Sequence, residues 1–198
     1  MRTLEEAAAE AAACTRCRLA QGRTQVVYGV GDPDADLMFI GEGPGYHEDK
    51  QGIPFVGAAG QLLNQMLSEI GIAREEVYIN NTVSCRPPGN RDPFPDELEA
   101  CKPWLDERIE LIDPKVIVTL GNFATRYVLG PRVSISRVRG QRFPWHGRTV
   151  IPTFHPAAII RGGGQASSQM AALRADFQEI RLALDERPAP VEEQLGLF

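Results

Sequence analysis

Four cysteines, widely separated in the sequence, constrain this chain more than any other feature. Cys14 and Cys17 form a C-x-x-C pair near the N-terminus, and Cys85 and Cys101 lie far downstream. A C-x-x-C pair places two thiolates on one short turn, as a tetrahedral metal ion or an iron–sulfur cluster requires. Two further ligands from distant segments would complete a four-thiolate site. Such a site would tie the N-terminal helix to the middle of the chain.

Other uses of these cysteines remain open at this point. Two disulfides would need an oxidising compartment, whereas residues 1–13 are acidic and Ala-rich and do not resemble a signal peptide. A redox-active C-x-x-C pair would leave Cys85 and Cys101 without a role. Structural zinc and a four-iron cluster both suit four thiolates, and the spacing alone barely separates them.

The composition predicts one globular domain over residues 1–184 and a flexible, Pro-rich tail over 185–198. The chain has 198 residues, of which 43% are hydrophobic, so a core can form without staples. Its longest apolar runs are too short to cross a bilayer, so we expect no membrane segment. A monomeric cytoplasmic protein is the expected state.

Charge is distributed unevenly along the chain. The formal net charge is −5, yet the stretch 114–175 contains nine Lys or Arg residues and no Asp or Glu. Such asymmetry is typical of a surface that binds a polyanion such as a nucleic acid. The alternative is a solvated face whose arginines pair with acidic helices elsewhere in the chain.

Short apolar runs alternate with helical patterns, which predicts an α/β fold. Strands are expected at 37–40, 77–83, 116–120 and 149–154, and helices at 3–13, 58–70, 96–111, 123–129 and 167–184. This order indicates a three-layer α/β/α sandwich around a central, mainly parallel, four-stranded sheet. Ligands of such folds bind at the carboxyl ends of the strands.

The segment GEGPG at 41–45 directly follows the first expected strand. It matches neither the dinucleotide fingerprint nor a Walker loop, but glycines such as Gly41 and Gly43 let a backbone approach a ligand closely. Glu42 and Glu48 flank the loop, and either could position a water molecule. As alternatives, they are exposed loop charges or helix caps.

Three further residues near strand ends have side chains suited to a nucleobase. Phe55, in a Gly/Pro loop, can stack on a base, or it can pack in the core. Asn81 offers a donor and an acceptor to a base edge, or it forms a turn, and Asn80 competes for the same role. His155 can donate a hydrogen bond to a developing oxyanion, although a lone histidine is more often structural.

Taken in order, these residues resemble the family 4 iron–sulfur uracil-DNA glycosylases. The resemblance runs from about Cys14 to about Ala183. It rests on CTRC at 14–17, GEGPGYHED at 41–49, GIPFVGAAGQLLN at 52–64, YINNTVSCRPP at 78–88, Cys101 and FHPAAIIR at 154–161. It implies an enzyme that flips uracil out of single- or double-stranded DNA and hydrolyses its glycosidic bond. It also implies that the four cysteines hold a structural [4Fe–4S] cluster.

The resemblance assigns roles to individual residues. Phe55 would stack on the extruded uracil, Asn81 would bind its N3 and O4, and His155 would donate to O2. Backbone amides near Glu42 and Gly43 would hold the base or the attacking water. Ile159 or Ile160 would wedge into the vacated stack. The arginines that would grip phosphates are Arg137, Arg139, Arg142 and Arg161.

The partner of the attacking water is the least defined role. In the best-known branch of this superfamily an Asp holds that water, and the matching position here is Gly43, so Glu42 is the first candidate and Glu48 the second. Tyr46-His47 stands where the family usually has acidic residues, which lowers the negative charge of the loop. The three lysines suggest no Schiff-base site, so we expect a monofunctional enzyme without lyase activity.

The C-terminal residues form a second, separate motif. Gln194, Leu195, Leu197 and Phe198 resemble the short peptide by which bacterial repair proteins bind the replicative sliding clamp. A frayed end or a last turn packed on the core is an equally simple interpretation.

Two rival functions use only part of these features. A non-enzymatic nucleic-acid-binding or redox-sensing module would explain the cysteines and arginines but leave GEGPG, Asn81 and His155 without a role. A phosphotransferase or nucleotide hydrolase would lack a P-loop lysine and an evident pair of Mg²⁺ carboxylates.

Overall fold

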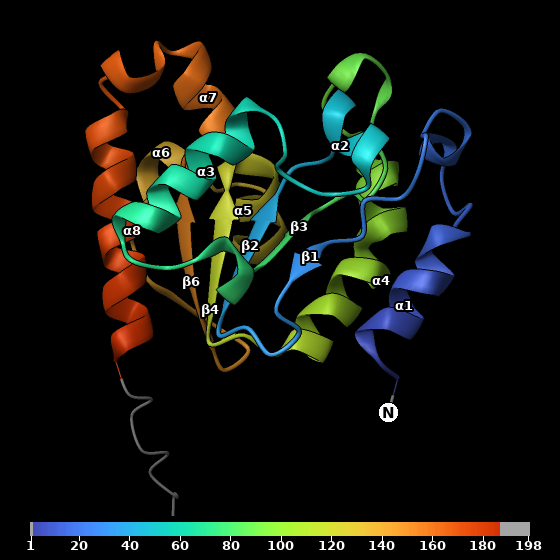
Figure 1. Cartoon of the computed structure of the whole chain (residues 1–198), viewed down its shortest axis with the longest axis horizontal. Coiled ribbons are helices and arrows are strands. Elements are labelled where there is room, and N and C mark those ends of the chain that lie inside the picture. The colour runs from blue at the N-terminus through green and yellow to red at the C-terminus, as the bar shows by residue number, and fades with distance from the viewer. Residues whose placement is uncertain (1, 187–198) are drawn as a thin grey trace, which may run out of the picture.

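A computed structural model describes residues 2–186, which form an α/β fold around one six-stranded sheet (Figure 1). The strand order is β1-β3-β2-β4-β6-β5. The four central strands pair in parallel, and β1 and β5 are antiparallel at the two edges. The strands are β1 (Val30–Gly31), β2 (Leu37–Gly41), β3 (Tyr78–Asn81), β4 (Val116–Leu120), β5 (Phe143–Trp145) and β6 (Arg148–Thr153).

The predicted count of four strands is wrong, because the two edge strands were missed. The four predicted strands form the parallel centre, as expected, within two residues at each end. The edge strands have only two and three residues, too few for a period of two to appear in the sequence. Each also contains a residue that weakens a strand pattern, Gly31 or Pro144, and a proline in a sheet is tolerated at an edge.

The central strands are buried on both sides, which explains their continuous apolar sequence. Every residue of β2 and β4 is buried. In β2, Phe39 packs in a cluster with α3 and α8, whereas its neighbours Met38 and Ile40 pack in another with α4 and α5. Successive side chains of a strand point to opposite faces, so one short segment supplies both layers of the core.

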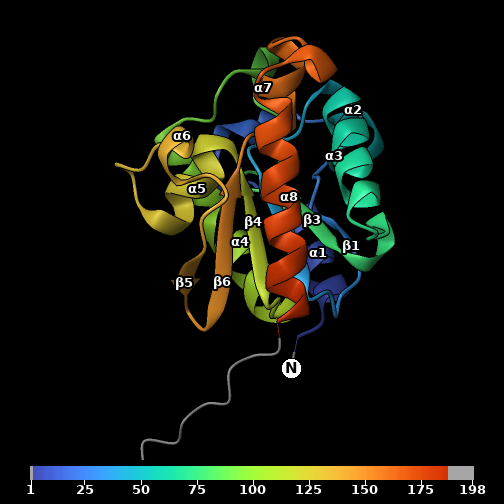
Figure 2. The same ribbon diagram turned by 90° about the vertical axis from the view of Figure 1, so that its left-hand side faces the viewer.

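Helices cover both faces of the sheet (Figures 1 and 2). The helices α3 and α8 lie on one face, and α1, α4 and α5 lie on the other. The helices are α1 (Leu4–Ala12), α2 (Tyr46–Gln51), α3 (Ala58–Glu69), α4 (Pro95–Ile112), α5 (Gly121–Leu129), α6 (Ile135–Val138), α7 (Pro156–Arg161) and α8 (Met170–Asp185). No helix within residues 2–186 is long and apolar enough to cross a membrane.

The five predicted helices are present, with ends that differ by up to three residues, but α2, α6 and α7 were not predicted. These three have four to six residues, so their sequence shows less than two turns of periodicity. The predicted tail, 185–198, lies outside the described residues except at its start. There Asp185 ends α8, and Glu186 pairs with Arg142.

Phe177 of α8 stacks on Phe39 of β2 with ring centroids 5.9 Å apart, and both are buried. We expect Phe177→Ala to lower the free energy of unfolding by about 3–5 kcal/mol, because a large cavity would open in the core. Leu182→Ala, on the same helix but 56% exposed, should change it by less than about 0.5 kcal/mol. Urea denaturation measures both, and equal effects of the two variants would contradict this packing.

Candidate active site and cysteine site

The four central strands end at one edge of the sheet, where a cavity of about 420 Å³ lies. Glu42 follows β2, Asn81 ends β3, Gly121 follows β4 and His155 lies just beyond β6. Parallel strands bring their carboxyl ends together, so residues far apart in the sequence meet here. The residues predicted for the site that line this cavity are Glu42, Gly43, Glu48, Phe55, Asn81, His155 and Arg161.

Gly41, the last residue of β2, lies behind the cavity wall. A Cβ atom at this position would stand 2.6 Å from the ring of Phe55 and would collide with the side-chain oxygen of Asn81. Glycine is therefore needed for the aromatic ring and the amide to approach the same strand end. Contact between the Gly41 backbone and a base stays a prediction.

Glu48 organises the loop that carries Phe55. Its Oε1 accepts hydrogen bonds from the backbone N–H groups of Val56 and Gly57, both at 3.0 Å. Phe55 has a φ of +54°, a left-handed conformation that is uncommon for a bulky residue and that the surrounding contacts must hold. Since Glu48 is engaged in this way, its geometry is that of a positioning residue for Phe55.

His155 is held as a neutral hydrogen-bond donor. Its Nδ1 accepts the backbone N–H of Ala157 at 3.1 Å, so the ring of the neutral form carries its proton on Nε2. Burial lowers the pKa of His155 to about 4, and the Arg161 cation acts in the same direction. The ring also stacks against Phe55, with centroids 5.6 Å apart.

Glu42 has the properties of a general base. Burial raises the pKa of its carboxyl to about 7, the charge of Asp92 adds to the shift, and Arg161 opposes it. A carboxylate with a pKa near neutrality can both hold a water molecule and accept its proton. The structure thus distinguishes the two glutamates, because the Oε1 of Glu48 already binds the loop.

Asn81 is almost fully buried, and its side-chain oxygen has no hydrogen-bond partner among the described residues. A buried amide oxygen without a partner is costly, so a ligand that supplies an N–H group to it would gain affinity. The competing residue Asn80 is also buried but does not line the cavity. The geometry therefore favours Asn81 over Asn80 as the base-contacting residue.

A buried arginine that sequence reasoning missed holds the Asn81 segment in place. Arg108 of α4 is 0% exposed, and its guanidinium donates to the backbone oxygens of Asn81, at 3.3 Å, and Tyr28. It also donates to Ser84 Oγ at 3.1 Å. Arg108 follows the apolar spacing of Leu105 and Ile109, which was the available signal, but a charged residue on such a stripe is usually assigned to the surface.

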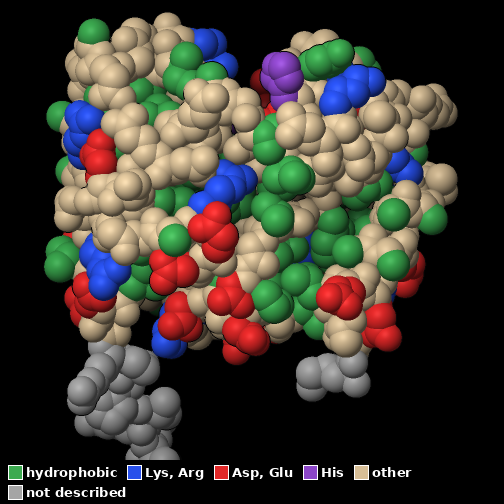
Figure 3. Space-filling view, viewed as in Figure 1, with side chains coloured by type: hydrophobic (Ala, Val, Ile, Leu, Met, Phe, Trp, Pro, Cys, Tyr) green, Lys and Arg blue, Asp and Glu red, His purple; other side chains and the backbone are tan. Residues whose placement is uncertain are grey.

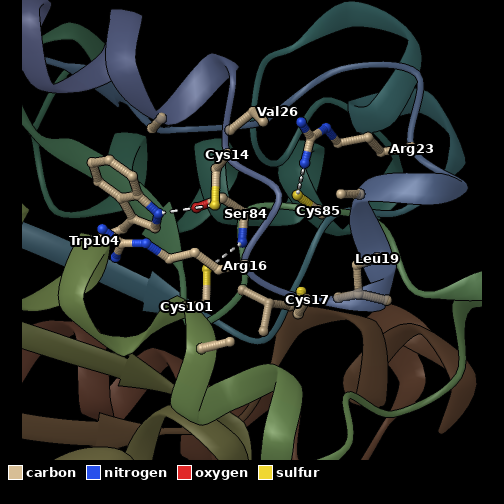
Figure 4. A pocket seen from close by; sticks show the side chains of 14 residues that line it. Cys14, Arg16, Cys17, Leu19, Arg23, Val26, Ser84, Cys85, Cys101 and Trp104 are labelled. Atoms are coloured by element: carbon tan, nitrogen blue, oxygen red, sulfur yellow. Dashed lines mark hydrogen bonds between the residues drawn. The ribbon is translucent and has the colours of Figure 1, made fainter.

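The four cysteines line a second cavity, between α1, the 3-10 turn at 18–21, the segment after β3 and α4 (Figure 4). All four are free thiols. The C-x-x-C pair comes from the end of α1, Cys85 from the loop after β3, and Cys101 from α4. Residues from distant segments thus line one cavity, and their use as ligands of one centre stays a prediction.

Each sulfur has an N–H donor beside it, as a thiolate requires. Trp104 Nε1 donates to Cys14 Sγ at 3.3 Å, and the backbone N–H of Ser84 donates to Cys101 Sγ at 3.3 Å. Arg23 donates to Cys85 Sγ at 3.4 Å, and the backbone of Leu19 bonds to Cys17. Figure 4 shows the first three of these contacts. A site built of four thiols and their N–H donors suits a thiolate-bound metal centre.

Comparison with known proteins places this arrangement in a family. The family model of the uracil DNA glycosylase superfamily matches residues 28–178. A type-4 uracil-DNA glycosylase of Sulfurisphaera tokodaii is 45% identical, over 99% of this chain and 92% of its own length. One of Thermotoga maritima is 53% identical, over 75% of this chain and 78% of its own. The chain belongs to the type-4 uracil-DNA glycosylases.

A more distant group is also similar to this type-4 family member. A type-5 uracil-DNA glycosylase of Thermus thermophilus is 34% identical, over 73% of this chain and 74% of its own length. The superfamily model begins at residue 28, so it includes Cys85 and Cys101 but not the C-x-x-C pair. The alignment with the type-4 relative of Sulfurisphaera tokodaii covers 99% of this chain and so extends over the segment that contains the pair.

Of the nine basic residues between 114 and 175 in this type-4 family member, five pair with carboxylates of the protein. Arg139 pairs with buried Asp176, and Arg142 pairs with Glu179 and Glu186. Further members of the 114–175 stretch that pair with carboxylates are Lys115, Arg148 and Arg174. The alternative interpretation of the charge asymmetry is therefore correct for these five residues.

Arg137 and Arg161 remain the better candidates for phosphate contacts. Arg137 is exposed, and Arg161 lies at the cavity. Two isoleucines were predicted to wedge into the base stack. Ile159 is fully buried in the core and cannot enter it, so Ile160, which is 39% exposed, is the remaining candidate. Phosphate binding by Arg139 and Arg142 stays a prediction, and their ion pairs weigh against it.

Sequence reasoning missed one wall of the cavity. Asn90, Arg91 and Asp92 line it from the Pro-rich loop before α4, and Phe123 lines it from α5. The four prolines of segment 86–95 predicted a loop correctly but gave no sign of the direction in which it folds.

We expect the His155 imidazole to stay neutral, with its proton on Nε2, down to about pH 5, since the burial that lowers its pKa to about 4 persists there. Long-range ¹H–¹⁵N NMR of the imidazole nitrogens reports both the charge and the tautomer. The signals absent from His155→Gln identify the residue. A titration near pH 6.5, or a proton on Nδ1, would contradict the geometry.

Proposed function

We propose that this chain is a monofunctional uracil-DNA glycosylase that extrudes deoxyuridine from DNA into the cavity and hydrolyses its N-glycosidic bond, which begins base-excision repair. Membership of the type-4 family supports the reaction. The observation that carries the proposal is that the buried amide oxygen of Asn81, which has no partner among the described residues, meets a neutral donor, His155, at one cavity.

Asn81 discriminates uracil by its hydrogen-bonding pattern. Its amide oxygen accepts the N3–H of uracil and its amide nitrogen donates to O4, whereas cytosine presents the reverse pattern at these two positions. A base with the wrong pattern would leave buried polar groups unpaired, which is a strong penalty. Phe55 stacks on the base. Extrusion costs a few kcal/mol, least for a mismatched or single-stranded base.

His155 stabilises the departing base. As the glycosidic bond lengthens, negative charge collects on the uracil ring, and the Nε2–H of His155 donates to O2. A neutral histidine suits this role, because the hydrogen bond that its Nδ1 accepts keeps the proton on Nε2, the nitrogen that donates to the base. Donors fixed in advance toward developing charge commonly supply several kcal/mol of barrier lowering.

Glu42 holds and deprotonates the water that attacks C1′ of the sugar. Its raised pKa of about 7 leaves a substantial fraction of carboxylate at neutral pH. The proton of the water passes to Glu42 as the C1′–O bond forms and the bond to uracil breaks. No lysine among the described residues lines the cavity, which supports hydrolysis without a Schiff base.

The cysteine site would hold a [4Fe–4S] cluster through Cys14, Cys17, Cys85 and Cys101. Four thiols from three separate segments line this cavity, and membership of the type-4 family favours a four-iron cluster over a single zinc ion. Such a cluster supplies structural cross-linking, since the site lies apart from the base cavity and shares no lining residue with it.

The predicted clamp-binding residues Gln194, Leu195, Leu197 and Phe198 lie outside the described residues. Binding of the sliding clamp through this peptide therefore stays a prediction, as do the monomeric state and the cytoplasmic location. Deletion of the last five residues would separate clamp binding from base excision.

The reaction is tested by incubating cluster-loaded protein with DNA that carries one uracil and quantifying free base by mass spectrometry. An identical strand with thymine is the substrate control. We expect release of uracil only, with Asn81→Ala and His155→Ala slower by about 10²–10³-fold, as for removal of one oxyanion donor. Unchanged rates in both variants would exclude this cavity as the site.

Activity should depend on pH through Glu42. Since its pKa is raised to about 7, kcat/KM should fall about tenfold per pH unit below 7, as the carboxylate becomes protonated. Glu42→Gln should be about 10²–10⁴-fold slower and should lose this limb of the profile. Glu48→Gln is the matched control, and it should keep the limb. A limb that survives in Glu42→Gln would assign the base elsewhere.

The cluster is tested by Cys85→Ser beside Thr15→Ala, an exposed residue within the C-x-x-C turn. We expect iron, sulfide and broad visible absorbance in the wild type and in Thr15→Ala, and their loss together with a lower Tm in Cys85→Ser. Stoichiometric zinc in a colourless protein would replace the iron assignment with a structural zinc site.

A further inference from the structure

Helix α2 forms one rim of the base cavity and turns both of its carboxylates inward. Glu48 accepts two backbone N–H groups of the Phe55 loop, and buried Asp49 accepts the backbone N–H of Thr24 at 2.8 Å. The exposed side chains of the helix are those of Tyr46, His47, Lys50 and Gln51. An apparently acidic segment, YHEDK, therefore presents an aromatic and basic surface.

Tyr46 is the centre of this surface. Its side chain is 51% exposed, and its ring has the guanidinium of Arg86 at 5.1 Å and the amine of Lys50 at 5.8 Å from its centroid. Arg86 donates to Asn90 Oδ1 and Lys50 to Thr24 Oγ1, and neither cation has a carboxylate partner among the described residues. Of the two arginines that line the cavity, Arg91 pairs with Glu97, whereas Arg161 has no carboxylate partner among the described residues.

This surface, which we call the α2 platform (Tyr46, Lys50 and Arg86), continues into the cavity. The cavity-lining residues include Gly45, which precedes α2, Glu48 on α2, and Asn90, which accepts a hydrogen bond from Arg86. Arg161 and exposed Ile160 of α7 stand on the opposite rim. Figure 3 shows the notch between the two rims, with His, hydrophobic and Lys or Arg side chains side by side over α2. Most of the Asp and Glu side chains of that view lie in its lower half, away from the notch.

We propose that the α2 platform binds the DNA strand beside the extruded nucleotide: an unpaired neighbouring base stacks on Tyr46, and the adjoining phosphates contact Arg86 and Lys50. The proposal rests on the proposed function, since DNA is the ligand. An exposed aromatic ring flanked by unpaired cations is the recurring element of single-strand binding. A base can stack on Tyr46 only when it is not base-paired in a duplex. The substrate class that this surface fits is therefore uracil in single-stranded or locally open DNA.

The test compares Tyr46→Ala with Tyr46→Phe, which keeps a stacking ring. Binding of each to a uracil-free single strand of 15 nucleotides is measured by fluorescence anisotropy. We expect Tyr46→Ala to bind about tenfold more weakly, near the low end for loss of one stacking aromatic, and Tyr46→Phe to bind like the wild type. Lys50→Gln and Arg86→Gln should each reduce the salt slope by about 0.7. Lys115→Gln, whose lysine pairs with Asp36, is the matched control.

Kinetics separate the platform from the chemistry. On the single strand with a central uracil, Tyr46→Ala should raise KM about tenfold and leave kcat unchanged. On deoxyuridine 3′,5′-bisphosphate, which has no neighbouring base, Tyr46→Ala should match the wild type. Binding by Tyr46→Ala equal to that of the wild type would overturn the proposal. A wild type that binds the strand through Tyr46 but releases no uracil would instead refute the proposed function.

Discussion

The buried guanidinium of Arg108 is the contact on which both sites depend. It binds the carbonyl of Asn81 and the hydroxyl of Ser84, and the backbone N–H of Ser84 binds Cys101. A fully buried charge depends on the oxygen partners that it has, so displacement of any one of them would be costly. The five residues from Asn81 to Cys85 are therefore fixed as one piece. The cysteine site shares no lining residue with the base cavity, yet through this segment it helps to hold the Asn81 amide in place.

Whether a basic residue of this protein is available to a ligand depends more on its ion pairs in the fold than on its position in the sequence. The long stretch without acids folds against acidic helices, which neutralise several of its arginines. The cations left without carboxylates near the cavity come from separate segments: Lys50 on α2, Arg86 at the start of the Pro-rich loop and Arg161 on α7. A polyanion such as DNA would therefore contact a few basic residues at the cavity rim and not a uniformly basic face. This agrees with the net charge of −5.

The sequence predicted what depends on long periodic segments and on strand ends. The four parallel strands and five long helices carry strong apolar patterns, and residues at the ends of parallel strands must meet, so Glu42, Asn81 and His155 were expected to converge. The edge strands and six-residue helices are too short for such a signal. The inward turn of Glu48 depends on tertiary contacts that no local pattern records, and the burial of Arg108 is indicated only by its place in the apolar spacing of α4.

The central claim is that Asn81, His155 and Phe55 together recognise uracil at one cavity. A crystal structure of the cluster-loaded protein with free uracil tests it most directly. The account predicts the base against Phe55, with the Asn81 amide in hydrogen-bond contact with N3 and O4 and His155 Nε2 in contact with O2. Uracil bound elsewhere, or in this cavity without contact to Asn81 and His155, would contradict it.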